Sequence, residues 1–255
     1  MRINEVKAII TGGASGLGLA TAERLVGGGA RVVLFDVNRD AGARAASQLG
    51  ANAHFEEVDV TQEPLVDAAV ARAQREMGGL NLVVNCAGVA WPRRIVNKEG
   101  PMPGDFFRKV IEINLVGTLL VCKAACAVMQ KNTPNEEGER GLIVMTASVA
   151  AFEGQIGQVA YSASKGGIVG MTLPMARDLA SSGIRVMTIA PGIFKTPLMA
   201  ALPQEAQDSL SKQVPFPARL GRPEEYAALV VHLCENVMLN GECIRLDGAI
   251  RMAPR

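Results

Sequence analysis

Short apolar runs alternate with segments of helical apolar spacing along almost the whole chain. The runs fall at 6–10, 31–35, 53–58, 80–84, 142–146, 184–189 and 242–246, and the helical segments at 16–26, 40–49, 64–77, 105–130 and 160–180, with another opening at Pro223. Strands separated by helices of this length predict βαβ units and a parallel sheet. Continuous aliphatic runs such as Leu82-Val83-Val84 favour strands that are covered on both faces. We therefore predict an α/β fold built on a doubly wound, seven-stranded parallel sheet with helices on both faces.

Polar and proline-rich stretches interrupt this alternation. The segments 91–104 and 131–141 are rich in Gly, Pro and Asn and predict solvent loops. The segment 191–217 contains five prolines and follows the carboxyl end of a strand, where open α/β sheets bind ligands, so we predict a substrate lid there. Pro174 lies inside a helical segment and predicts a kink or a break. No linker-like composition divides the chain, which predicts one domain over residues 1–255.

The balance of charge excludes several classes of partner. The 255 residues include 26 Lys and Arg against 25 Asp and Glu, a net charge of +1, which leaves no field to hold nucleic acid or an anionic membrane. We see neither a leader sequence nor an uninterrupted apolar run of about 18 residues, so we expect a cytoplasmic protein without a membrane span. The five cysteines have no metal-ligand spacing and predict reduced thiols and no metal site.

A glycine-rich turn joins the first strand to the first helix. Its sequence is Thr11-Gly12-Gly13-Ala14-Ser15-Gly16-Leu17-Gly18. Glycines in this arrangement let the turn close and let backbone N–H groups and the helix N-terminus approach a pyrophosphate. Because the motif directly follows a strand and opens a helix, we favour a Rossmann-type nucleotide site over a simple tight turn.

An aspartate stands where the second strand ends. Asp36 lies 18 residues after Gly18. A carboxylate at that distance accepts hydrogen bonds from ribose hydroxyls and repels a 2′-phosphate, which predicts NAD rather than NADP. Capping the next helix is the alternative role for this aspartate. Arg39 is the nearby cation that a 2′-phosphate could use.

A tyrosine and a lysine share one face of the helical segment 160–180. Tyr161 and Lys165 are four residues apart, so the phenol and the ammonium lie on the same side. Lowering the phenol pKa from about 10 to near neutrality takes roughly 4 kcal/mol, which the lysine and a positively charged nicotinamide ring can supply together. Such a pair by itself is more often exposed on the surface and without a catalytic role. Ser148, just beyond the strand at 142–146, adds a hydroxyl at the same edge of the sheet and predicts a proton-transfer site.

Further motifs join these in a definite order. The set is Thr11-Gly12-x-x-x-Gly16-x-Gly18, Asn85-Cys86-Ala87-Gly88, Asn114, Ser148, Tyr161-x-x-x-Lys165 and Pro191-Gly192. It resembles the short-chain dehydrogenase/reductase family over essentially the whole chain. Cys86 stands where that family more often has a second asparagine, and we interpret it as a packing variant.

The resemblance implies an NAD-dependent oxidoreductase. Tyr161 is then the acid/base and Ser148 orients the substrate oxygen. Lys165 supports the tyrosine and the cofactor ribose, and Asn114 holds a proton-relay water. The implied cofactor-binding residues are Gly12, Ser15, Gly16, Leu17, Gly18, Asp36, Asp59, Val60, Asn85, Ala87, Gly88, Tyr161, Lys165, Pro191, Gly192, Ile193 and Thr196.

Longer stretches narrow the resemblance. Residues 146–155, 161–173, 183–192, 214–217 and 240–252 are similar to family members that oxidise 3-hydroxyacyl-CoA. This implies oxidation of a (3S)-3-hydroxyacyl-CoA to the 3-ketoacyl-CoA with NAD, as in fatty acid β-oxidation, by a homotetramer. Substrate contacts are then expected from Ser148, Gln155 and Tyr161, although Gln155 could equally be a plain loop amide.

Two features bear on partners. Arg93, Arg94 and Lys98 either meet CoA phosphates or form a solvated basic loop. The small residues of Gly166-Gly167-Ile168-Val169-Gly170 permit close packing of another helix, from a partner subunit, or packing on the chain's own sheet.

Other functions stay open. The catalytic residues are shared across the family, so a hydroxysteroid or other secondary-alcohol dehydrogenase fits the same motifs. Some relatives also serve as scaffold subunits of an RNA-processing complex, although the net charge of +1 argues against RNA binding by this chain alone. A serine hydrolase is disfavoured because G-x-S-x-G is absent.

Overall fold

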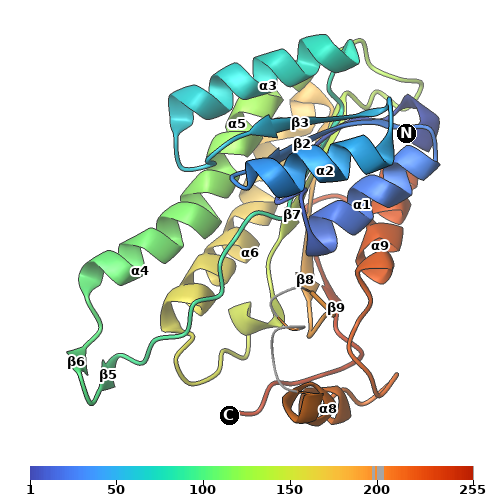
Figure 1. Ribbon diagram of the computed structural model, residues 1–255. Helices are drawn as coiled ribbons and strands as arrows, with labels where there is room; N and C mark the ends of the chain where they lie inside the picture. The colour runs from blue at the N-terminus through green and yellow to red at the C-terminus, as the bar shows by residue number, and fades with distance from the viewer. Residues whose placement is uncertain (197–198, 200–203, 255) are drawn as a thin grey trace.

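The computed structural model describes residues 1–196, 199 and 204–254, which form a parallel sheet between two layers of helices (Figure 1). The strands are β1 (Lys7–Thr11), β2 (Arg31–Asp36), β3 (Ala53–Glu57), β4 (Leu82–Asn85), β7 (Gly141–Thr146), β8 (Ile184–Pro191) and β9 (Cys243–Leu246). Their order is β3-β2-β1-β4-β7-β8-β9, with parallel pairing throughout. The predicted doubly wound, seven-stranded sheet is confirmed within the described part of the chain, and each strand lies within two residues of its predicted bounds.

Alternation along the strands divides the apolar core between the two faces. Ile9 and Val83 pack on one face of the sheet, and Ile10 and Val84, one residue further along, pack on the other. The first face is covered by α3 (Glu63–Met77), α5 (Gly117–Met129) and α6 (Val159–Leu179), and the second by α1 (Gly16–Gly27), α2 (Arg39–Leu49) and α9 (Pro223–Glu235). Both faces are therefore buried, which explains the continuous aliphatic runs.

A long helical run crosses the first face. It consists of α4 (Gly104–Ile111), a π-helical turn at Glu112–Val116, and α5. By length and composition this run could span a membrane. Charged residues interrupt its apolar sequence, so it contains no uninterrupted apolar stretch. Half of its most apolar 18-residue window is buried inside the protein, and the run packs against α3 and α6. Packing in the core accounts for its apolar character.

The structure differs from the sequence predictions at the segment 91–104 and at Pro174, and it describes only part of the predicted lid. The segment 91–104 is more than a solvent loop, because it contains the antiparallel pair β5 (Val96–Asn97) and β6 (Gly100–Pro101), too short to show a period. Of the kink or break predicted at Pro174, the break does not occur, because α6 continues through this residue and Gly170, whose carbonyl loses its donor, is exposed. The predicted lid contains α8 (Gln204–Lys212), whereas Pro197 and Pro203 lie outside the described residues.

A buried ion pair joins the amino-terminal ends of β7 and β8. Arg185 Nη2 lies 2.6 Å from Glu139 Oε1, and the two side chains are 8% and 5% exposed. Arg185 also donates hydrogen bonds to the carbonyl oxygens of Leu233, Asn236 and Leu239 at the end of α9. One guanidinium thus connects the sheet to the last helix.

Glu139→Ala is expected to lower the free energy of unfolding by about 3–5 kcal/mol, because it leaves the Arg185 charge buried without a counterion. Denaturant unfolding measures this change. Glu137→Ala, at an exposed position of the same loop, is the matched control and should be near neutral. Equal stability of the two variants would contradict the prediction.

Candidate active site

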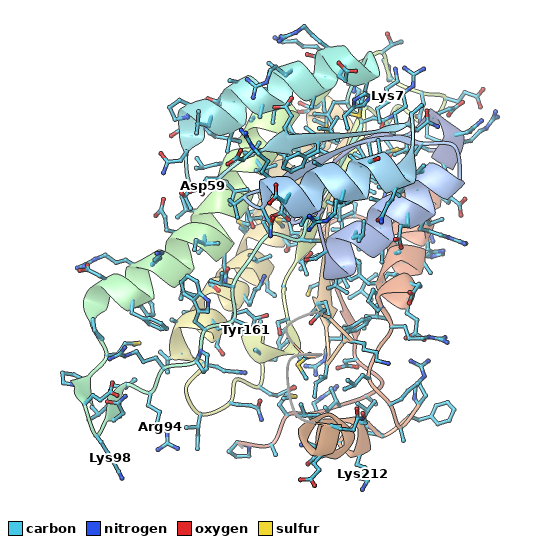
Figure 2. The ribbon with its side chains drawn as sticks, viewed as in Figure 1. Lys7, Asp59, Arg94, Lys98, Tyr161 and Lys212 are labelled. Carbon is cyan, nitrogen blue, oxygen red and sulfur yellow. The ribbon has the colours of Figure 1, made fainter. Side chains whose placement is uncertain are left out.

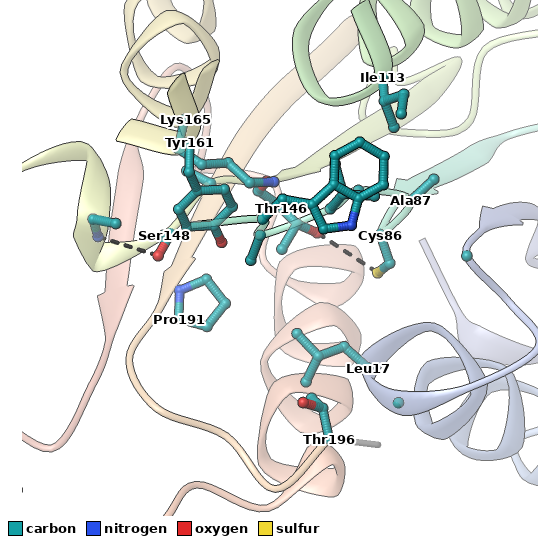
Figure 3. Close-up of a pocket in the computed structure, with 18 of the residues that line it drawn as sticks. Leu17, Cys86, Ala87, Ile113, Thr146, Ser148, Tyr161, Lys165, Pro191 and Thr196 are labelled. Carbon is teal, nitrogen blue, oxygen red and sulfur yellow. Dashed lines mark hydrogen bonds between the residues drawn. The ribbon is translucent and has the colours of Figure 1, made fainter. Parts of the chain in front are cut away.

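A cavity of about 1170 Å³ opens at the carboxyl ends of the strands (Figure 3). It includes the crevice between β1 and β4, where the strand order reverses and doubly wound sheets bind their ligands. The predicted residues that line it are Gly12, Ser15, Gly16, Leu17, Gly18, Asp36, Asp59, Val60, Ala87, Gly88, Ser148, Gln155, Tyr161, Lys165, Pro191, Gly192, Ile193 and Thr196. Asn85 and Asn114 are not part of this lining. The fold therefore brings most of the predicted site together in one cavity.

Two positions in the turn between β1 and α1 require glycine, because a Cβ there would collide with neighbouring backbone atoms. Gly12 has a φ of 63°, and a Cβ there would lie 2.9 Å from the backbone nitrogen of Ala87. A Cβ on Gly18 would lie 2.3 Å from the carbonyl oxygen of Gly12. Ser15 is the N-cap of α1 and makes no side-chain capping bond, so the N–H groups of the first turn are not taken by that side chain. This backbone suits close approach of a diphosphate.

Asp36 lines the cavity without capping a helix. Its Oδ2 accepts a hydrogen bond from the Ala14 nitrogen at 3.1 Å, and its Oδ1 accepts one from the Asn38 nitrogen at 3.0 Å. Asn38 is the N-cap of α2, so the capping role considered for Asp36 is wrong. Arg39 is paired with Glu57 at 2.7 Å and does not line the cavity. Asp36 is held in place by two backbone N–H groups, and the nearby Arg39 is already paired with Glu57. This arrangement fits ribose hydroxyls better than a 2′-phosphate.

The predicted reacting groups come from the end of β7 and the start of α6. Figure 3 shows the side chains of Tyr161 and Lys165 extending from α6 into the cavity, with the Ser148 hydroxyl close to the Tyr161 phenol. The Ser148 hydroxyl lies close enough to the phenol to lower its pKa, and Ser148 Oγ accepts a hydrogen bond from the Ala150 nitrogen at 3.1 Å. Lys165 Nζ lies 5.8 Å from the centre of the Tyr161 ring. The spacing of four residues therefore brings the phenol and the ammonium to one place.

Burial controls the protonation of both groups. It lowers the pKa of Lys165 to about 8, because the charged form is poorly solvated there. Burial also raises the pKa of Tyr161, an effect that the nearby Ser148 hydroxyl offsets only in part. Lys165 directs its ammonium at the Thr146 carbonyl oxygen, 2.7 Å away. In the protein without cofactor, burial therefore outweighs the effect of Ser148 on the phenol pKa, and the lowering of that pKa by Lys165 together with a nicotinamide ring stays a prediction.

Asn114 lies below the cavity, in the π-helical turn between α4 and α5. It is fully buried, and its Oδ1 accepts a hydrogen bond from the Val89 nitrogen at 2.8 Å. Its Nδ2 donates to the Val89 carbonyl oxygen at 2.9 Å and to Ser164 Oγ at 3.0 Å. This side chain joins the loop after β4 to α6. Its role in holding a relay water stays a prediction.

The end of β4 forms part of the cavity floor. Asn85, expected to bind the cofactor, is buried beneath the lining and donates to Cys122 Sγ at 3.4 Å. Cys86 lines the cavity, with its Sγ 3.6 Å from Thr146 Oγ1, which lies 2.7 Å from the Tyr226 hydroxyl. Burial raises the pKa of Cys86, so the thiol stays protonated and packs as a small neutral group. These contacts agree with the packing interpretation of Cys86.

Gln155 lines the cavity, but its amide nitrogen is engaged elsewhere. Gln155 Nε2 donates to the Ala253 carbonyl oxygen at 3.1 Å, and the Ile156 nitrogen donates to the Pro254 carbonyl oxygen at 3.0 Å. These bonds hold the C-terminal segment against the loop between β7 and α6, and Met252 joins the cavity lining. A substrate contact from Gln155 stays a prediction.

Several lining residues were missed by the sequence analysis. They include Trp91, Val89, Ala90, Arg108, Lys109, Glu112, Ile113, Gln158, Phe194, Met199, Leu210 and Met252. Most belong to α4 or to loops, and only the tertiary structure brings them to the cavity. The available clue was the chain's single tryptophan, three residues after Gly88.

Comparison with known proteins identifies the family. The model of short chain dehydrogenases matches residues 6–207. The chain belongs to the short chain dehydrogenase family. It is therefore an oxidoreductase acting on a CH–OH group, and the resemblance found in the sequence is confirmed.

The relatives are similar over nearly their whole length. The chain is 57% identical over 249 residues to human 3-hydroxyacyl-CoA dehydrogenase type-2, covering 97% of this chain and 95% of that protein. It is 53% identical over 254 residues to the Drosophila melanogaster protein of the same name, covering 99% and 100%. The crystal structure of 3-hydroxyacyl-CoA dehydrogenase type-2 from Mycobacterium avium is 44% identical, with a TM-score of 0.94 over 98% of this chain and 97% of that one.

Lys165→Met should change how stability depends on pH. The pKa of Lys165 is about 8 in the folded protein against an ordinary value of 10.5, so between these pH values the unfolded chain binds more protons. Burying the ammonium therefore destabilises the folded wild type most below pH 8, and this effect fades as the pH rises to 10.5. The free energy of unfolding of Lys165→Met, relative to wild type, should fall by about 3 kcal/mol over that range.

Urea unfolding of both proteins at neutral and alkaline pH measures the difference. Lys131→Met, at an exposed position, is the control for loss of a solvated ammonium. A Lys165→Met difference that stays constant with pH would show that burial of the charge is not the cause.

Proposed function

We propose that the protein oxidises a (3S)-3-hydroxyacyl-CoA to the 3-ketoacyl-CoA with NAD as hydride acceptor. The observation that carries this proposal is that Ser148, Tyr161 and Lys165 line the same cavity as the glycine turn and the Asp36 carboxylate. The names of relatives that are 53% and 57% identical support the choice of substrate.

The cavity has the features that NAD requires. Gly12 and Gly18 allow the tight turn whose backbone lines the cavity, where a diphosphate can approach it, and Asp36 offers a carboxylate to ribose hydroxyls. A Cβ on Gly88 would lie 3.1 Å from Asn114 Oδ1 and 3.6 Å from Lys165 Nζ, so glycine keeps the space beside this ammonium open. This open space supports the proposed binding of a second ribose by Lys165.

The side chains around the reacting carbon divide the chemistry between them. Bound NAD⁺ supplies the hydride acceptor and a positive ring charge that favours ionised Tyr161. Ser148 donates a hydrogen bond to the substrate hydroxyl oxygen and holds it beside Tyr161. The Tyr161 phenolate would take the proton of the substrate hydroxyl, while the carbon that bears this hydroxyl loses its hydrogen as a hydride to the cofactor. The C–O bond thereby becomes a carbonyl. Lys165, buried below, keeps a positive charge near the ionised phenol.

A cationic loop supports a CoA thioester rather than a steroid as substrate. A second cavity of about 510 Å³ is lined by Arg93, Arg94 and Lys98, together with residues of the loop that holds Gln155. Arg93 Nε is buried without a hydrogen-bond partner among the described residues. Figure 2 shows Arg94 and Lys98 projecting outward at the end of the molecule that carries β5 and β6. Cations in this arrangement suit the phosphates of CoA, which a steroid lacks.

The homotetramer is also a proposal. A Cβ on Gly167 would lie 2.6 Å from the Leu115 side chain, so this glycine packs within its own chain, whereas a Cβ on Gly170 would meet nothing within 4 Å. Leu119 on α5 and Leu173 on α6 are each 45% exposed. Leu173 lies three residues after the open Gly170 on α6, and uncovered leucines together with an open glycine favour helix packing between subunits. Sedimentation equilibrium tests this, and a monomer mass would contradict it.

Tyr161→Phe should reduce turnover by about 10²–10⁴-fold, because the variant cannot transfer the substrate proton. Binding of NADH, measured by its fluorescence, should stay near wild type, since the cofactor cavity is unchanged. Near-normal turnover in this variant would overturn the assignment of Tyr161.

A substrate panel tests the chemical class. Oxidation of NADH is followed with acetoacetyl-CoA, a longer 3-ketoacyl-CoA and a ketosteroid in parallel, and kcat/KM should be higher for the thioesters. A preference for the ketosteroid would support the hydroxysteroid dehydrogenase alternative instead.

A further inference from the structure

The loop between β4 and α4 places the chain's single tryptophan in the wall of the active-site cavity. Trp91 lines this cavity and is 40% exposed. Aromatic residues make up only 4% of the chain, and Trp91 takes no part in the proton transfer described above. This large apolar side chain is partly exposed within the cavity, where it can contact a bound ligand.

Contacts on the protein side hold the indole in place. The Trp91 and Phe106 ring centres are 6.4 Å apart, with an interplanar angle of 45°. Lys109 Nζ lies 5.7 Å from the Trp91 ring centre, and the Arg93 guanidinium carbon lies 5.8 Å from that of Phe106. Aromatic and cation–π contacts of this kind order the indole while part of it stays exposed.

The backbone on either side of Trp91 is anchored at two parts of the site. Val89 is held through its nitrogen and its carbonyl oxygen by the Asn114 side chain, which also contacts α6. The Arg93 nitrogen donates to the Gly157 carbonyl oxygen at 2.8 Å, and both residues line the cationic second cavity. Trp91 therefore lies between the segment next to the reacting groups and the segment that carries the cations.

We propose that Trp91 is the surface against which the pantetheine arm of an acyl-CoA lies. This inference rests on the proposed function, which puts the thioester at Tyr161 and the CoA phosphates at Arg94 and Lys98. The arm that joins those two ends then passes the wall formed by Trp91. Pantetheine is uncharged and consists of methyl, methylene and amide groups, for which an indole offers broad dispersion contact. Trp91 is thus a specificity residue for CoA esters.

Three substrates distinguish contact with the pantetheine arm from binding of the CoA phosphates and from the chemical step. Acetoacetyl-CoA carries arm and nucleotide phosphates, S-acetoacetyl-pantetheine carries the arm alone, and ethyl acetoacetate carries neither. Trp91→Ala should lower kcat/KM about tenfold for the first two, mainly through KM, and leave ethyl acetoacetate unchanged. Trp91→Phe should restore most of the loss. The double variant Arg94→Glu/Lys98→Glu should affect acetoacetyl-CoA only.

Val96→Ala is the matched control, because Val96 lies in the same connection, is 64% exposed and lines neither cavity described here. It should behave as wild type with all three substrates. The single tryptophan also reports binding without turnover: S-acetoacetyl-pantetheine, which has no adenine, should shift or quench the Trp91 emission, and ethyl acetoacetate should not.

The outcomes distinguish the two proposals. If wild type reduces acetoacetyl-CoA but Trp91→Ala keeps its kcat/KM with S-acetoacetyl-pantetheine, the role of Trp91 is overturned and the proposed function stands. An unchanged Trp91 emission on saturation with S-acetoacetyl-pantetheine likewise overturns it. If wild type does not reduce acetoacetyl-CoA, the proposed function fails, and the inference about Trp91 fails with it.

Discussion

The hydrogen bond from the buried Lys165 ammonium to the Thr146 carbonyl oxygen joins the reacting helix to the sheet. At 2.7 Å it connects α6 to the last residue of β7, whose hydroxyl contacts Tyr226 from α9 on the other side of the sheet. Burying this charge opposes folding and lowers the pKa of Lys165 to about 8. Tyr161 lies one helical turn earlier on the same helix, so the contact that holds Lys165 to the sheet also anchors the segment of α6 that carries the phenol.

The protonation of Tyr161 follows from the same burial. An enclosed position raises the pKa of a phenol, and here the nearby Ser148 hydroxyl offsets only part of that effect. In the proposed mechanism the positive ring of bound NAD⁺ supplies the missing stabilisation. Under that proposal the base would become active only with the hydride acceptor bound, which would disfavour proton removal without hydride transfer.

The substrate end of the cavity depends on loops that are held by polar and charged contacts. Arg245 makes two hydrogen bonds to Glu153, at 2.8 and 2.9 Å, and one to Asp247 at 2.8 Å. A small apolar cluster of Val149, Val214 and Ile250 lies beneath these segments. The loop after β7, the end of the predicted lid and the C-terminal segment are thereby fixed to each other. A wall built from loops can change between relatives without disturbing the sheet.

The amino-acid sequence by itself determined the sheet, its helical layers and the reacting groups, because strand and helix periods, the glycine turn and the four-residue spacing of Tyr161 and Lys165 are local patterns. Tertiary structure alone decided that Asn85 and Asn114 support the cavity from below, that the Lys165 ammonium turns to the Thr146 carbonyl oxygen, and that Trp91 enters the wall. These outcomes depend on contacts between segments far apart in the chain and on burial, and neither has a period that the sequence displays.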